Sequence, residues 1–319
     1  MKNRNAEYWI NRYLDIDEED KKNEKKLLNK IFKIYEDAYE EVTKRLYAFY
    51  TQYADDNGIT YQEAIKALKP HELKECSRRI RRLHDLMEQI DTSTPFGRQQ
   101  KQRLQREIQL LRNRGRVTRE MALIDSINEE MIKVALEIDK ELGELVKKTY
   151  TREYEEILEE ANVTVNPIPV KALEQSLLTP TYGDHFSDRV WNNKDKLITF
   201  IRTELRKGLV EGRDVRKTAK ILEKHLGVSE YEARRLVVTE NCIARTQGSL
   251  EGYKQSNVVE YVTIIACLDK RTCVDCRDAD GEVIKLEDAV VGVNMPPLHP
   301  RYNLIVVAQF ARIFKSDLL

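Results

Sequence analysis

Two long stretches of helical periodicity limit what this chain can fold into. Apolar side chains recur three and four residues apart from Leu27 to Tyr50, and again from Met121 to Val146. This spacing puts them on one face of an α-helix, so each stretch predicts a long amphipathic helix that packs along its length. We therefore expect a mainly α fold with an extended helical N-terminal body.

The composition agrees with long, solvated helices. Charged residues make up 34% of the 319 residues, and Lys+Arg and Asp+Glu both number 54. Balanced charge argues against binding nucleic acid through overall positive charge, although local basic patches stay open as sites. No apolar run approaches the roughly 20 residues that span a bilayer, so we expect no membrane segment and synthesis in the cytoplasm. Five cysteines in a chain of this length do not form a disulfide framework, which favours a reducing compartment.

A change of composition divides the chain. Residues 162–170 read NVTVNPIPV, a β-branched stretch with two prolines and no charge, which is typical of a boundary. We expect a long-helix body for assembly and partner binding at 1–162 and a second domain at 163–319. Within the second domain, Ser229 followed by Glu232 predicts the capped start of a helix from Glu230 to about Tyr253. A small α+β module is expected at 259–307, with strand-like runs at 261–265, 282–286 and 304–307.

The same module carries the most specific chemistry. Cys273 and Cys276 form a C-x-x-C, and His299 follows later in the module. Two thiols at this spacing can face one point, which suits half a zinc site or a redox pair. A closed zinc site needs four ligands, and Cys267 or Asp269 would have to supply the fourth. The alternative is a metal-free knuckle, in which the cysteines pack and His299 bonds to a backbone carbonyl.

Two expected helices of the body, at about 71–89 and 98–111, carry basic faces. Such faces are solvated and balanced by neighbouring carboxylates in most proteins, but they also suit phosphate contacts that read no base sequence. The candidate DNA contacts are Arg78, Arg79, Arg81, Arg82, Arg98, Lys101 and Arg103.

Several short motifs follow one another in the second half of the chain. They are Ile243-Ala244-Arg245-Thr246, Leu268-Asp269-x-x-Thr272-Cys273-x-x-Cys276, Asp280-Gly281 and Asn294-x-Pro296-Pro297-x-His299-Pro300. In this order they resemble the C-terminal domain of the phage minor head protein family, the head morphogenesis proteins similar to protein F of phage Mu. The resemblance covers roughly residues 180–307. Its motif residues here are Arg245, Thr246, Asp269, Thr272, Asp280, Gly281, Asn294, Pro297 and Pro300.

The resemblance implies a structural minor capsid protein of a tailed-phage virion, located in the head interior or at the portal vertex. Its implied partners are the portal protein, capsid and scaffold proteins, and double-stranded DNA during packaging or ejection. We expect no enzymatic activity and no cofactor, with a structural zinc ion as the alternative. The family motif commonly ends His-Pro-x-Cys-Arg-Cys, whereas Arg301, Tyr302 and Asn303 follow His299-Pro300 here. The absence of both thiols weakens the case for a metal.

Two other functions stay open. One is a DNA-processing or nucleotide-modifying enzyme that uses the Arg245/His299 region, and the other is a DNA-binding packaging accessory protein. Carboxylates for a catalytic metal lie nearby at Asp275, Asp278 and Asp280, but Asp280-Gly281 is more simply a hairpin turn. On the structural hypothesis, Arg245 pairs with a carboxylate of the module. Asp269, Thr272 and Asn294 would then hold the turn by hydrogen bonds.

Overall fold

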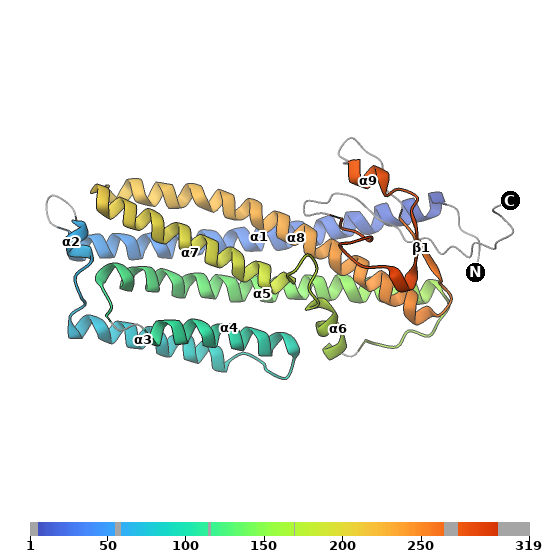
Figure 1. The fold of residues 1–319 in the computed structure, drawn as a ribbon, viewed down its shortest axis with the longest axis horizontal. Helices are drawn as coiled ribbons and strands as arrows, with labels where there is room; N and C mark the ends of the chain where they lie inside the picture. Colours follow the sequence, from blue (N-terminus) through green and yellow to red (C-terminus); the bar gives the residue numbers. More distant parts are fainter. Residues whose placement is uncertain (1–5, 55–58, 114–115, 169, 265–273, 299–319) are drawn as a thin grey trace. The chain divides into compact units, whose positions relative to one another are not determined.

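The computed structural model describes residues 6–54, 59–113, 116–168, 170–264 and 274–298 (Figure 1). These residues form helices and one two-stranded sheet near the C-terminus, which confirms the predicted mainly α fold with a small α+β module. The helices are α1 (Ala6–Tyr53), α2 (Tyr61–Ala64), α3 (Pro70–Glu88), α4 (Pro95–Arg112), α5 (Arg119–Glu160), α6 (Val170–Leu177), α7 (Phe186–Glu211), α8 (Val215–Ser256) and α9 (Val274–Asp278). The strands are β1 (Tyr261–Thr263) and β2 (Val283–Lys285). Within the described ranges, no helix combines the length and the apolar character needed to cross a bilayer.

The ends of several helices follow from local sequence chemistry. The Thr60 hydroxyl accepts a hydrogen bond of 3.2 Å from the Glu63 amide and so caps the start of α2. Thr94 caps α4 in the same way, with Pro95 at the first helical position. The predicted helix start at Ser229 is wrong, because α8 continues through this residue. The Ser229 hydroxyl instead donates to the carbonyl of His225, one turn back, at 3.4 Å.

The chain divides into two compact units whose segments alternate along the sequence. Unit 1 takes residues 1–28, 141–186 and 234–319, and unit 2 takes residues 29–140 and 187–233. The helices α1, α5 and α8 therefore contribute residues to both units. The stretch around residue 162, where the sequence changes composition, lies inside a continuous segment of unit 1.

The core of unit 2 is built from the predicted apolar faces. The side chains that are almost fully buried there come from several helices, because each helix turns one apolar stripe inward. They include Ile31 and Leu46 of α1, Leu83 of α3, Leu104 of α4, Ile127 and Ile132 of α5, and Leu205 of α7. The helices α3 and α4 lie side by side as a hairpin (Figure 1).

Unit 1 holds the C-terminal module. Its strands pair antiparallel, with Val262 opposite Ile284. The turn before β2 requires Gly281, whose φ is +82° and whose amide donates to the Ile264 carbonyl at 2.8 Å. The apolar cluster of the module also includes Ile157 of α5 and Leu250 and Tyr253 of α8. The module is therefore packed onto two long helices. The strand predicted at 304–307 lies outside the described residues.

Candidate functional site

The motif residue Arg245 lies on α8 in a row of polar side chains one turn apart. Asn241 donates to Glu24 at 2.8 Å, Arg245 forms an ion pair with Asp20, and Ser249 donates to Glu153 at 3.4 Å. The row faces α1 and α5 within unit 1. We expected Arg245 to pair with a carboxylate of the C-terminal module. In the described residues, the structure pairs it with Asp20 of α1.

Asp20 is the centre of this arrangement. Its side chain is 1% exposed and also accepts a hydrogen bond of 2.8 Å from Arg152 of α5. Arg152 contacts Glu153 at 2.8 Å as well. We call Asp20, Glu24, Arg152, Glu153 and Arg245 the buried charge cluster. Because an unpaired buried charge is costly, the cluster fixes how the three helix segments pack within unit 1.

Burial affects the ionisation of groups in and near the cluster. Desolvation raises the pKa of Glu153, against the lowering effect of Arg245 and Arg152. It also raises the pKa of Glu24, although the hydrogen bond from Asn241 lowers it. Burial raises the pKa of the neighbouring Cys242 thiol to about 12. This thiol is therefore protonated at neutral pH.

Two glycines of α8, which none of the sequence motifs includes, bring this helix close to α5. A Cβ on Gly248 would overlap the Tyr150 carbonyl and lie 3.1 Å from the Glu153 Cβ, and one on Gly252 would lie 2.8 Å from the Ile157 Cβ. These glycines therefore allow the helices of unit 1 to approach within backbone contact. In the sequence, the feature that points to this close approach is the spacing of the two glycines, one turn apart on a helix that is otherwise rich in large side chains.

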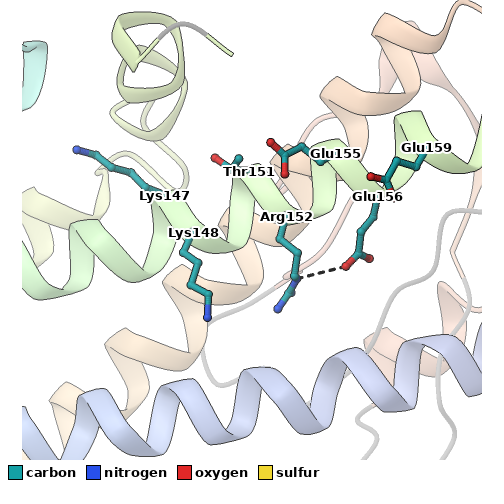
Figure 2. A pocket seen from close by; sticks show the side chains of 7 residues that line it. All are labelled: Lys147, Lys148, Thr151, Arg152, Glu155, Glu156 and Glu159. Atoms are coloured by element: carbon teal, nitrogen blue, oxygen red, sulfur yellow. Dashed lines mark ion pairs between the residues drawn. The ribbon is translucent and has the colours of Figure 1, made fainter. Parts of the chain in front are cut away.

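A shallow pocket of about 540 Å³ lies along α5 beside the cluster (Figure 2). Figure 2 shows Lys148 and Arg152 projecting toward α1, with Glu156 beside Arg152. Each basic side chain in the lining is neutralised within unit 1: Lys147 pairs with Glu174, Lys148 with Glu19 at 3.6 Å, and Arg152 with Asp20. The pocket therefore has no excess positive charge that would select an anion.

The sequence patterns also did not reveal the buried carboxyl of Asp139, in unit 2. Asp139 of α5 accepts hydrogen bonds from Gln100 at 3.1 Å, Ser187 at 3.0 Å and Trp191 at 3.4 Å. Burial outweighs these bonds and raises its pKa to about 6. In the sequence, the feature that points to burial of Asp139 is its position next to Ile138, on the apolar face of the predicted helix.

The predicted residues of the C-terminal module are described only in part. Asn294 bridges the loop before it, since it accepts from the Val290 amide at 2.7 Å and donates to the Asp288 carbonyl at 2.8 Å. The buried Pro297 carbonyl accepts from the Tyr182 hydroxyl, and the buried Thr246 hydroxyl donates to the Cys242 carbonyl at 3.1 Å. Asp280 is exposed at the turn, and Cys276 lies on α9.

The zinc hypothesis falls on residues outside the described ranges. Cys267, Asp269, Thr272, Cys273, His299 and Pro300 all lie there. In the part of the chain that the structure describes, no three side chains of the His, Cys, Asp and Glu types gather as metal ligands.

The candidate DNA contacts differ in how their charges are used. Arg79 is buried and lies 3.3 Å from Glu129, which also binds Arg82 at 2.6 Å. Arg103 bonds to the Ser187 carbonyl at 2.8 Å and to the Asp188 carboxylate. Lys101 lies 3.5 Å from Glu88. Arg78, Arg81 and Arg98 are exposed.

Part of the chain is similar to a known protein family. Residues 199–301 match a family model described as Phage Mu protein F like protein. The matched segment contains the second half of α7, all of α8 and the described residues of the C-terminal module. It includes Arg245 and Gly248, whereas Asp20, Arg152 and Tyr150, which they contact, lie outside it. No curated protein and no solved structure matches the chain.

Proposed function

We propose that this chain is a structural head-morphogenesis protein of a phage, in keeping with the family that residues 199–301 match. The main support is the role of Arg245 within the matched segment. Its guanidinium is 12% exposed and is paired with the buried Asp20 of the same unit. A side chain held in this way contributes to helix packing and is not presented to a substrate.

The same region offers little to an enzyme. The Cys242 thiol next to Arg245 is protonated at neutral pH, and Glu153 bonds to Arg152 and Ser249. A general acid or base has to reach a substrate atom, which buried and internally paired groups do not do. We therefore favour the structural role over a DNA-processing or nucleotide-modifying enzyme.

The finer part of the proposal is association with the portal and the inner face of the procapsid, in the virion of a tailed phage. The test is co-expression with the portal, scaffold and major capsid proteins of the same phage, followed by sedimentation of the procapsids. We expect the chain to sediment with procapsids that contain portal and to be absent from those assembled without it.

Two results would contradict this proposal. One is a chain that never enters procapsids although it is folded and abundant. The other is a metal-dependent activity on DNA or nucleotides that disappears in the His299→Ala variant, because this would favour the enzyme.

A packaging accessory that contacts DNA is the second candidate, and the exposed Arg78, Arg81 and Arg98 favour it. Phosphate contacts would make binding to duplex DNA weaken as salt rises, with a shallower salt dependence after these arginines are changed to alanine. Arg103→Ala is the matched control for a guanidinium already bound within unit 2. Equal DNA binding by wild type and the triple variant would exclude this role for the three side chains.

We propose that the module needs no cofactor, with structural zinc as the alternative. The measurement is zinc per chain after purification without a metal-affinity step. Near-stoichiometric zinc that is lost in Cys273→Ser would contradict the metal-free module and would reopen the question of an enzyme.

A further inference from the structure

Unit 2 contains a groove with an aromatic floor and an acidic rim. It has a volume of about 660 Å³ and lies between α1 and α8. Its floor includes Phe32, Tyr35 and Tyr39, and its rim carries Glu36, Glu40, Glu223 and Glu230. The lining of α1 runs from Asn29 to Glu40, which corresponds to about 17 Å of helix. A groove of this length and character fits one face of a short helix.

The acidic rim is neutralised only in part within the described residues. Glu36 pairs at 3.2 Å with Lys33, which also lines the groove. Glu40, Glu223 and Glu230 are exposed and form no ion pair with any described residue. Three unpaired carboxylates around an apolar floor favour a partner that brings both positive charge and apolar surface.

The helix α4 has the complementary surface. Arg98, Arg106 and Arg112 are exposed on α4, and Leu110, one turn from Arg106, is 64% exposed. Arg106 and Arg112 form no ion pair with any described residue. The single carboxylate of α4, Glu107, is already bound to Lys194 at 2.6 Å. From Arg98 to Arg112 this face runs about 21 Å, close to the length of the groove.

We propose that the exposed face of α4 in one copy of the chain docks into the α1–α8 groove of a second copy. Arg106 and Leu110 are one turn apart and share the face that would enter the groove. Arg106 would face Glu40, Glu223 and Glu230, Leu110 would cover the aromatic floor, and Arg112 would add positive charge at the end of the helix. The contact joins two different surfaces, so it is heterologous and can extend into a ring or a filament. It depends on the chain alone, whether or not the chain is a head protein.

The first test is sedimentation velocity of the purified full chain over a range of concentrations. We expect reversible association at about 0.05 M salt and a Kd about tenfold weaker at about 0.5 M, because screening shortens the reach of the charges. A groove variant (Glu40→Lys, Glu223→Lys, Glu230→Lys) and a helix variant (Arg106→Gln, Leu110→Gln, Arg112→Gln) should each associate about tenfold more weakly or worse.

The decisive step is to mix the two variants. The groove variant still has an intact α4, and the helix variant still has an intact groove. An equimolar mixture should therefore form 1:1 pairs that do not grow further, although neither variant associates alone.

The matched control carries Glu137→Lys, Glu144→Lys and Glu159→Lys, exposed positions outside the groove with the same change in net charge. It should associate like the wild type. Circular dichroism and Tm establish that each variant is folded.

Four outcomes would overturn the proposal. The first is a chain that stays monomeric at low salt at every concentration. The second is a control that associates as weakly as the groove variant, and the third is a mixture that forms no pair. In the fourth, the helix variant loses binding to duplex DNA while its sedimentation is unchanged, which would assign these arginines to nucleic acid.

Discussion

Asp20 accepts bonds from two guanidinium groups, Arg152 of α5 and Arg245 of α8, while its own side chain is almost fully buried. A carboxylate in this position depends on its cations, because burial without them would cost several kcal/mol. At the scale of single residues, packing within unit 1 is therefore sensitive to side chains that look like ordinary surface charges in the sequence.

Arg245→Met should lower the free energy of unfolding by about 2 kcal/mol, since Asp20 keeps Arg152 but loses its second cation. Equilibrium urea unfolding measures this change, and a cycle with Asp20→Asn isolates the pair. Arg81→Met is the control, because Arg81 is exposed and a surface change of this kind costs about 0.5 kcal/mol or less. Equal effects of the two substitutions would mean that the pair contributes nothing.

Asp139 should make stability depend on pH. Its pKa is about 6 in the folded chain and 3.8 ordinarily, so the folded state holds the proton more tightly. This contribution is most favourable below the ordinary pKa and is lost as pH rises through the folded pKa. Between about pH 5 and pH 8 the chain should lose about 1 to 2 kcal/mol from this carboxyl.

The measurement is the free energy of unfolding against pH for the wild type and for Asp139→Asn, which cannot ionise. The difference between the two curves should show the loss. Asp85→Asn, at an exposed position, should run parallel to the wild type. Parallel curves for Asp139→Asn would show that the buried carboxyl does not titrate in this range.

Single residues were predictable where the cause is local. Thr60 is an N-cap because its neighbours start a helix, and Asn241, Arg245 and Ser249 share a face because they are one turn apart. The partners of Arg245 were not predictable. Asp20 is far away in the sequence, and many carboxylates in this charged chain are equally plausible by composition.

At the scale of helices and strands, Gly248 and Gly252 decide how closely α8 approaches α5 in unit 1. Gly→Ala inside a helix normally stabilises by up to about 1 kcal/mol. Gly248→Ala should instead destabilise by about 2 kcal/mol or more, because the new methyl overlaps the Tyr150 carbonyl.

Thermal unfolding measures the sign of this effect. Gly208→Ala is the control, since its new Cβ would lie 3.1 Å from the Thr218 hydroxyl, a mild crowding, and 3.7 Å or more from Arg213, but would meet no backbone atom. It should change Tm much less than Gly248→Ala. A rise in Tm for Gly248→Ala would show that the two helices can separate at little cost.

The helices themselves were largely predictable, because periodicity reports the buried face directly. The predicted stretches at 27–50 and 121–146 lie within α1 and α5. The failure at Ser229 has a physical reason: a serine that could cap a helix can also bond back to the carbonyl one turn earlier inside one. Packing along α8 decides whether the serine caps a helix or lies inside one. This packing cannot be predicted from the local sequence.

At the scale of the whole molecule, unit 1 draws on three segments that are far apart in the chain. Composition marks a boundary near residue 162. It does not report that Ile157 belongs to the apolar cluster of the C-terminal module, or that Asp20 pairs with Arg245. Such pairings depend on complementary side chains across long sequence separations, which periodicity cannot rank.

A fragment of residues 163–319 should therefore fold poorly alone. It lacks Asp20, Arg152 and Ile157, so it would expose the α8 row and part of the module's apolar cluster. Adding residues 141–162 should restore part of the stability, and the full chain should be the most stable of the three. Urea unfolding and resistance to proteolysis measure this order. A 163–319 fragment as stable as the full chain would contradict it.

The division of unit 1 among distant segments also sets an order of events during synthesis. Residues 1–28 leave the ribosome first, but the segment that begins at residue 234 is made about 206 residues later. At roughly 5 to 20 residues per second, the first segment waits about 10 to 40 s before it meets Arg245. During that interval its apolar face has no native partner from α8. Chaperone binding to the nascent N-terminal helix, followed by release after α8 emerges, is the consequence we would look for in the translating cell.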